Sequence, residues 1–352
     1  MEFSLASLGW NARWAETFEQ QCPAGDQTLV PGRVGREDRD RYLVFTRAGE
    51  VPARLSGKLR HAAPMRELLP VVGDWVALRL AADGGLALVE GILPRRSSFG
   101  RRGISVEGRR TGQQVLAANF DTVFLVSGLN EDFQPRRIER YLTIAWDSGA
   151  RPVIILNKAD LCADVARRRA EVEPSAAGVP ILAMSAVTGE GLEALDAYLA
   201  PEQTVIFLGS SGVGKSSLIN RLLGDERQET MNVRAYDGRG RHATTAREMF
   251  LLSGGAVLID TPGLRQIQAW GFDEGLERVF DDIEALAEGC RFRDCRHDSE
   301  PGCAVKQAVA DGALDARRLG NYLRLQREDA VLAVRRSQRA RMIVGPGGKR
   351  LR

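Results

Sequence analysis

A glycine-rich segment in the middle of the chain has the residue types that hold a chain of phosphates. Residues 209–216 read GSSGVGKS, which matches the pattern G-x-x-x-x-G-K-[ST]. Glycines let backbone amides approach phosphate oxygens, and the start of the following helix adds positive potential. Lys215 is expected to act in catalysis by reaching the β- and γ-phosphates, and Ser216 to ligate Mg²⁺. The predicted loop comprises Gly209, Ser210, Ser211, Gly212, Val213, Gly214, Lys215, Ser216 and Ser217.

A second phosphate contact is predicted where the later apolar run GAVLI ends in the residues DTPG. Asp260 is expected to hold the Mg²⁺ shell, and Gly263 to donate its amide to the γ-phosphate. By itself this tetrapeptide is an ordinary turn. Its place behind an apolar strand, downstream of the phosphate loop, makes it more specific.

The segment between these two motifs, GRGRHATTAREMF at 238–250, is predicted to be a switch. Thr245 is expected to close over the γ-phosphate and Mg²⁺, with Thr244 as the alternative. Many GTPases place a water-orienting glutamine directly after D-x-x-G, but Leu264 stands here and cannot orient water. Slow intrinsic hydrolysis is therefore expected. His242 is the candidate to supply the missing positioning, and a solvent-exposed loop histidine is the competing interpretation.

Two earlier motifs predict that the base is guanine. The carboxylate of Asp160, in NKAD at 157–160, can accept from guanine N1–H and N2–H₂ together, donors that adenine lacks. Asn157 and the stem of Lys158 are expected to brace the base. Ser185 and Ala186 are expected to offer a backbone amide to guanine O6.

A cluster of cysteines late in the chain predicts a metal site. Cys290, Cys295, His297 and Cys303 follow the pattern C-x₄-C-x-H-x₅-C. Three thiolates and one imidazole form a closed tetrahedral set, which is typical of one structural Zn²⁺ ion. The segment is charged and has few apolar residues, so a metal would help it fold. Free thiols beside a surface histidine are the alternative.

Alternating strands and helices from about residue 120 are predicted to position these motifs. Four runs rich in Val, Ile, Leu and Phe read as parallel strands buried on both faces, and GAVLID as a fifth strand. The expected strands are 121–127, 151–157, 179–185, 203–209 and 255–260, and the expected helices 135–147, 163–173, 190–199 and 215–224. In such an open α/β sheet, ligands bind beyond the carboxyl ends of the strands, where the motifs lie.

The remaining segments predict a multidomain protein. Short β-rich runs from 29 to about 100 indicate a small antiparallel barrel, and its basic charge favours an OB-type barrel although an SH3-like barrel has similar runs. The segment 10–21 could be one short helix. The expected division is an N-terminal extension (1–28), an OB-fold-like barrel (29–110), a circularly permuted α/β P-loop domain (111–273), a mostly helical zinc-binding domain (274–340) and a basic flexible tail (341–352).

The charged residues are distributed unevenly along the chain, although the net charge of the 352 residues is only +3. The segment 94–110 has six arginines and one glutamate, which favours a polyanion contact over an ordinary solvated surface. The candidate RNA-binding residues are Arg95, Arg96, Arg101, Arg102, Arg109 and Arg110. No apolar run approaches the roughly 20 residues of a membrane span. A cytoplasmic protein without a membrane partner, acting as a monomer, is expected.

The order of the motifs is unusual, because the guanine-reading motifs precede the phosphate loop. A circular permutation gives this order while assembling the same pocket. With NKAD, GSSGVGKS, GRGRHATT and DTPG together, the chain resembles the bacterial RsgA family of GTPases that depend on the small ribosomal subunit. The resemblance covers nearly the whole chain.

This resemblance implies GTP hydrolysis that the small subunit stimulates late in its maturation, and an OB-fold that contacts ribosomal RNA. It also implies zinc at the four matching positions, and it favours His242. The switch reads HATT where the family usually has HTTT, so the choice of threonine stays open. The alternatives are a P-loop ATPase or kinase, an RNA-binding assembly scaffold with incidental nucleotide turnover, and a permuted GTPase of the large subunit.

Overall fold

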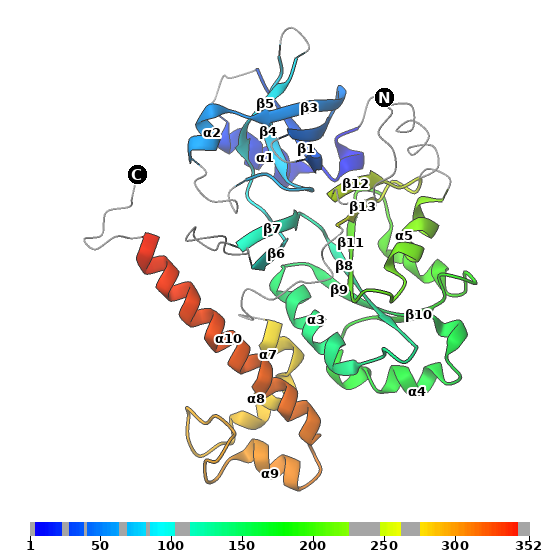
Figure 1. The fold of residues 1–352 in the computed structure, drawn as a ribbon, viewed down its shortest axis with the longest axis vertical. Coiled ribbons are helices and arrows are strands. Elements are labelled where there is room, and N and C mark those ends of the chain that lie inside the picture. The colour runs from blue at the N-terminus through cyan, green and yellow to red at the C-terminus, as the bar shows by residue number, and fades with distance from the viewer. Residues whose placement is uncertain are drawn as a thin grey trace.

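The computed structural model describes residues 4–22, 28–38, 41–62, 69–81, 85–102, 113–224, 247–261 and 275–343. A β-barrel, an α/β sheet and a group of C-terminal helices follow one another along the chain (Figure 1). Some predicted site residues lie outside the described ranges, and their roles remain predictions: Arg109, Arg110, His242, Thr244, Thr245, Gly263 and Leu264.

The N-terminal segment packs onto the barrel through aromatic side chains. A 3-10 turn, η1 (Ala6–Leu8), precedes helix α1 (Ala12–Gln21), which falls within the predicted segment 10–21. Asn11 caps this helix because its side chain accepts from the Trp14 backbone N–H at 3.3 Å. Trp10 and Trp14 lie 4.7 and 6.2 Å from the ring of Trp75 in the barrel. The segment is therefore part of the packed core rather than a loose extension.

In the part of the chain that the structure describes, five strands close into the barrel: β1 (Leu29–Asp38), β2 (Arg41–Thr46), β3 (Gly49–Leu55), β4 (Trp75–Arg79) and β5 (Ala87–Ile92). They pair in the order β1-β2-β3-β5-β4 and back to β1, with β3 and β5 parallel, and helix α2 (Gly57–Ala62) lies between β3 and β4. The parallel pair and the inserted helix confirm the OB-type barrel.

Strand β1 was not anticipated, because it contains a proline and two glycines. Close packing requires glycine here, because a Cβ on Gly32 would lie 2.6 Å from Cγ1 of Val44. Arg33, on the same strand, is 1% exposed and joins the barrel to the rest of the protein. It donates to Leu8 O, to Gly73 O at 3.3 Å, to Asn119 O at 2.7 Å and to Thr204 Oγ1 at 3.0 Å. Burial lowers the pKa of Arg33 to about 10, so it is charged at neutral pH.

Within the described residues, the α/β sheet has six strands: β8 (Thr122–Gly128), β9 (Arg151–Asn157), β10 (Ile181–Met184), β11 (Thr204–Gly209), β12 (Arg247–Leu251) and β13 (Val257–Asp260). Their order is β10-β9-β8-β11-β13-β12, with β12 antiparallel and the others parallel. The five predicted strands are thus present, and β12 is an addition. Strand β12 also pairs with β1 of the barrel, which joins the two sheets.

Both faces of this sheet are covered, as the apolar runs predict. On β8, Val123 and Leu125 pack toward helix α3 (Pro135–Asp147), whereas Phe124 and Val126 pack toward helix α5 (Lys215–Leu223). The shorter connections are η3 (Ala159–Leu161), α4 (Val165–Ala170), η4 (Glu173–Ser175) and η5 (Leu192–Tyr198). The helix predicted at 190–199 is therefore a 3-10 helix.

A separate hairpin, β6 (Ser98–Arg102) and β7 (Gln113–Ala118), links the barrel to the α/β sheet. The predicted boundary between residues 110 and 111 falls in the connection of this hairpin, outside the described residues. The predicted domain limits therefore remain predictions. Phe99 is 2% exposed and stacks on Phe120 at 4.7 Å, so its ring belongs to the core.

The C-terminal part is helical, with α7 (Gly275–Val279), α8 (Asp281–Ala287), α9 (Ala304–Ala310) and α10 (Ala316–Ile343). Helix α10 runs diagonally across the lower left of the view and packs beside α7 and α3 (Figure 1). Tyr322 and Leu325 of α10 belong to the same buried cluster as Phe280 and Ile283, and the rings of Phe280 and Tyr322 lie 5.4 Å apart. Within the described residues, every helix is too short or too polar to cross a membrane.

Candidate nucleotide site and metal centre

The phosphate loop connects β11 to α5, as the motif predicts. Gly209, Gly212 and Gly214 have φ values of +158°, +81° and +99°, a backbone range that favours glycine. A Cβ on Gly209 would lie 2.4 Å from Val126 O of the neighbouring strand. Ser216 and Ser217 are exposed in the first turn of α5. The loop geometry therefore depends on glycine at Gly209 and Gly214 through both torsion and space, and at Gly212 through its torsion alone.

Lys215 begins helix α5 and folds over the loop. Its Nζ donates to the carbonyl oxygens of Gly209 at 2.7 Å and Ser210 at 2.5 Å. These contacts hold the ammonium group above the loop, on the residues whose amides are expected to meet phosphate oxygens. Its phosphate-binding role remains a prediction.

Asn157 joins the phosphate loop to the base-reading segments. It ends β9, is 1% exposed, and donates from Nδ2 to Val213 O at 2.8 Å. Its Oδ1 accepts from the Ala186 backbone N–H at 3.0 Å. A Cβ on Gly214 would lie 2.1 Å from Nδ2 of Asn157, so the two segments are in direct contact. Segments separated along the chain thus meet at one edge of the sheet, as the predicted permutation requires.

The predicted guanine-reading residues surround this contact. Lys158 adopts a left-handed backbone with φ of +67°, and Asp160 is exposed in η3 immediately after it. Ser185 is buried, and its Oγ accepts from the backbone N–H groups of Val187 at 3.2 Å and Thr188 at 3.1 Å. The Ala186 amide, predicted to face guanine O6, donates to Asn157 in this structure.

Asp260 ends β13, beside the phosphate-loop strand, and Thr261 after it is buried. This places the predicted Mg²⁺ carboxylate at the same edge of the sheet as the phosphate loop. The remaining residues of the DTPG motif and the predicted switch lie outside the described residues.

Three residues around the site were missed by the sequence analysis, because they belong to no motif. Arg137 and Tyr141 of α3 contact Ser210 Oγ, at 3.0 Å from Arg137 Nη1 and 3.2 Å from Tyr141 Oη. Arg221 of α5 donates to Ala186 O at 3.1 Å and to Val187 O at 2.8 Å. Arg137 and Tyr141 are spaced i, i+4 on α3, and Arg137 and Arg221 are cationic. A search for such residues near the motifs would have found these signals.

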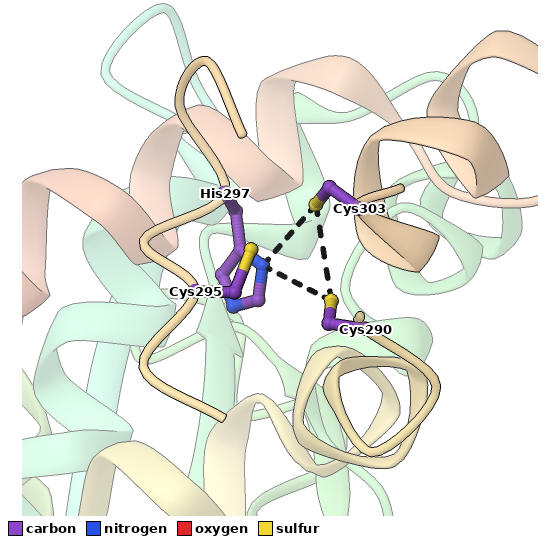
Figure 2. A group of neighbouring side chains, drawn as sticks. All are labelled: Cys290, Cys295, His297 and Cys303. Carbon is purple, nitrogen blue, oxygen red and sulfur yellow. Dashed lines mark hydrogen bonds between the residues drawn. The ribbon is translucent and has the colours of Figure 1, made fainter. Parts of the chain in front are cut away.

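The four predicted metal ligands come together in the C-terminal part of the chain. Figure 2 shows Cys290 after α8, Cys295 and His297 on the following loop, and Cys303 at the start of α9. Their ligand atoms all lie within 4.8 Å of one another. His297 Nδ1 is 3.7 Å from Cys290 Sγ and 3.4 Å from Cys303 Sγ, and those two sulfurs are 3.9 Å apart.

These distances fit a tetrahedral ion. Zn–S bonds of about 2.3 Å and Zn–N bonds of about 2.0 Å at tetrahedral angles separate neighbouring ligand atoms by roughly 3.5 to 3.8 Å. The loop between His297 and Cys303 is held by Glu300, whose carboxylate accepts from the backbone N–H groups of Arg296 and Asp298. Hydrogen bonds from its own backbone N–H and from these two lower the pKa of Glu300 to about 2.

The predicted RNA-binding arginines differ in their surroundings. Arg95 donates from Nε and Nη2 to the buried carboxylate of Asp74 at 2.8 and 2.7 Å, and to Leu69 O at 2.8 Å. Burial raises the pKa of Asp74, and the hydrogen bonds from Arg95 oppose that shift. The guanidinium of Arg95 is thus held by partners inside the protein, and its predicted RNA contact stays a prediction.

The other described arginines of this set are Arg96, Arg101 and Arg102. Arg96 is partly exposed, contacts Asp121 at 3.4 Å and lies over the Trp14 ring at 5.0 Å. The backbones of Arg101 and Arg102 belong to β6. Nothing in this arrangement tests whether they contact RNA, and that role stays a prediction.

The fold and the site define a class of protein: a circularly permuted P-loop GTPase with an OB-type barrel before it and a helical module with a Cys₃His cluster after it. More specifically, the chain belongs to the RsgA GTPase family, because residues 92–270 match the model of that family. The protein named small ribosomal subunit biogenesis GTPase RsgA from Opitutus terrae is 47% identical over 341 residues, covering 94% of this chain and 91% of that protein. The protein of the same name from Syntrophotalea carbinolica is 44% identical, covering 97% and 93%.

Solved structures agree on the fold. YjeQ from Thermotoga maritima is similar with a TM-score of 0.61 and 27% identity, over 85% of this chain and 98% of that one. YloQ, described as a circularly permuted GTPase, has a TM-score of 0.58 and 23% identity, over 88% and 98%. The match covers nearly the full length of both solved structures, so the similarity extends beyond the central sheet.

Proposed function

We propose that this chain is a Mg²⁺-dependent GTPase that binds the small ribosomal subunit and couples GTP hydrolysis to late steps of its maturation. The observation that carries the proposal is the bridge made by Asn157, which joins the phosphate loop at Val213 to the base-reading segment at Ala186. Family membership and the names of the two relatives support the ribosomal role.

Within this site each residue has a proposed task. Asp160 recognises guanine, and the amides of the phosphate loop with Lys215 hold the phosphates. Ser216, Asp260 and Thr245 complete the Mg²⁺ shell. The remaining contacts concern the γ-phosphate: Gly263 donates its amide to it, and His242 orients the attacking water in place of glutamine.

The base preference has a direct test at Asp160. Replacing Asp160 by Asn removes the acceptor for guanine N1–H and supplies a donor that suits xanthine, so preference should move from GTP to xanthosine triphosphate. Asp311→Asn, which changes an exposed carboxylate at the end of α9 in the C-terminal part, is the matched control and should keep GTP preference. The proposed recognition of guanine would be contradicted if Asp160→Asn kept its preference for GTP over xanthosine triphosphate. It would also be contradicted if the unmodified protein bound ATP more strongly than GTP.

The cysteine/histidine cluster is proposed to hold one structural Zn²⁺ ion through Cys290, Cys295, His297 and Cys303. The measured separations and the three-thiolate donor set support this assignment. With four protein ligands the ion has no open position, so its proposed role is to stabilise the C-terminal module rather than to act in hydrolysis.

The proposed partner is the small subunit and its ribosomal RNA, with arginines of the β6–β7 hairpin as contacts and a monomeric cytoplasmic protein as the acting form. The decisive experiment is a GTPase assay titrated with purified small subunits, with large subunits in a parallel arm. Phosphate release should rise with small subunits and stay constant with large ones. Binding to small subunits without any acceleration would favour a scaffold, and acceleration by large subunits would favour a large-subunit factor.

A further inference from the structure

The start of helix α3 places a guanidinium group directly against the phosphate loop. Arg137 donates from Nη1 to Ser210 Oγ at 3.0 Å, and Tyr141, one turn later, lies 3.2 Å from the same oxygen. Ser210 also receives Lys215 Nζ at its carbonyl. Two cationic side chains from different helices therefore meet on one residue of the loop that is expected to bind a polyanion.

The other partner of Arg137 is neutral. Its Nη2 donates to Gln134 Oε1 at 3.1 Å, and the side chain is half-buried. In the described part of the chain its hydrogen bonds go to a hydroxyl and an amide, and no ion pair involves it. Its neighbour Arg140 instead pairs with Glu328 at 2.9 Å. A half-buried cation with neutral partners loses hydration without an opposing charge, and an anion bound to the loop would supply that charge.

We propose that Arg137 is a positioning residue for the triphosphate: it fixes Ser210 in the loop and contributes positive charge that favours GTP over GDP. The triphosphate carries more negative charge than the diphosphate, so the benefit of a nearby cation is larger for GTP. Charge fixed in a partly dehydrated site also costs no reorganisation when negative charge shifts during phosphoryl transfer. This inference rests on the proposed GTPase function and adds a residue that no nucleotide motif contains.

The planar guanidinium suits this task better than an ammonium group. Arginine presents several N–H donors in a fixed fork, so one side chain can hold Ser210 and Gln134 together while keeping its charge at the loop. Tyr141 contributes a second contact to Ser210 without charge. Ser210 therefore keeps one hydrogen-bond partner when the charge of Arg137 is removed.

The experiment measures dissociation constants for fluorescent GDP and for a fluorescent non-hydrolysable GTP analogue, together with single-turnover GTP hydrolysis. The variants are Arg137→Met, Arg137→Lys, Ser210→Ala and the double variant of Arg137→Met with Ser210→Ala. Arg136→Met is the matched control, because it removes an exposed arginine at the preceding position. Melting temperatures are recorded for every variant, so that loss of packing is separated from loss of charge.

Arg137→Met should weaken the GTP analogue about tenfold and GDP clearly less, with a slower single-turnover rate. Arg137→Lys should recover at least half of the loss on a logarithmic scale. The effects of Arg137→Met and Ser210→Ala should be non-additive, because the two groups act through one contact.

Several outcomes would overturn the inference. They are a GTP-to-GDP affinity ratio in Arg137→Met equal to that of Arg136→Met, equal losses for both nucleotides with a lowered melting temperature, no recovery in Arg137→Lys, or strict additivity in the double variant. If Arg137→Met does not fold, Arg137→Lys and Ser210→Ala decide the question alone. An unmodified protein that binds neither guanine nucleotide would instead refute the proposed function itself.

Discussion

Arg137 and Glu139 lie two positions apart on α3 and point to opposite sides of the helix, as a 100° step per residue requires. Arg137 contacts the phosphate loop at Ser210, whereas Glu139 accepts from Arg318 Nη1 of α10 at 3.1 Å. Asn321 and Ser175 also donate to the Glu139 carboxylate. One helix therefore contacts the nucleotide site on one face and the C-terminal module on the other.

Removing the cation from this buried pair should destabilise the protein. Arg318 and Glu139 are 8% and 7% exposed at their side chains, and Arg318 also binds Asp282 at 2.6 Å. Arg318→Met leaves a buried carboxylate without its cation, so we expect a loss of about 3 to 5 kcal/mol in the free energy of unfolding, measured by urea denaturation. Arg317→Met, at the exposed neighbouring position, should change it by less than about 0.5 kcal/mol. Equal effects of the two substitutions would show that the pair is not stabilising.

Glycine at position 214 is predicted to be indispensable for nucleotide binding. An alanine there would place Cβ 2.1 Å from Asn157 Nδ2, at a φ of +99°. Either Asn157 or the loop must then move. A misplacement of about 1 Å in a binding site costs roughly 100-fold, and we expect a loss of this order in the affinity for GDP. Titration with fluorescent GDP measures the loss. Gly178→Ala, at a φ of +70° with open space around it, should cost about 1 to 2 kcal/mol in stability but keep the GDP affinity. Normal GDP binding by Gly214→Ala would contradict the assigned loop geometry.

Local patterns in the sequence were enough to place five strands of the α/β sheet and the motifs at their ends. The runs before Asn157 and Gly209 are apolar because both faces of the sheet are covered. Such continuous apolar runs can be recognised as buried strands from the sequence alone. The metal ligands were equally recognisable, because thiolate and imidazole ligands close together in the chain indicate coordination.

What the sequence could not predict depends on contacts between distant residues. Arg95 belongs to a basic run, yet its partner Asp74 lies 21 positions earlier and is completely buried. Charge counting alone does not show such a partner. Strand β1 was missed because its glycines make room for Val44 across the barrel, and that closeness exists only after folding. The contact between Arg137 and Ser210 is likewise tertiary, since 73 positions separate the two residues.

Metal removal should unfold the C-terminal module selectively. Cys303 is 7% exposed, and its Sγ both faces His297 and accepts from the Lys306 backbone N–H at 3.4 Å. Cys303→Ser should lower the zinc content from about one ion per chain to near zero and reduce the melting temperature by roughly 10 °C. A strong chelator should have the same effect on the unmodified protein, seen by circular dichroism. Cys162→Ser, which is remote from the cluster in sequence, should retain the metal, and equal zinc loss in both variants would refute the assignment.

The barrel is predicted to keep its place on the α/β sheet largely through Arg33. Its guanidinium satisfies three carbonyl oxygens and the Thr204 hydroxyl, from four different segments of the chain, and it lies 5.3 Å from the Trp75 ring. Arg33→Met keeps most of the apolar stem but removes these hydrogen bonds. Gly73 O keeps a hydrogen bond from Asn119 Nδ2, so three acceptors lose their donor. The free energy of unfolding should therefore fall by at least about 3 kcal/mol in urea denaturation, since each unpaired buried acceptor costs roughly 1 kcal/mol or more. Proteolysis should become faster between the barrel and the sheet, because the barrel is held less firmly. Arg36→Met, on the same strand but only half-buried, provides the comparison, and a smaller loss in Arg33→Met than in Arg36→Met would exclude this role.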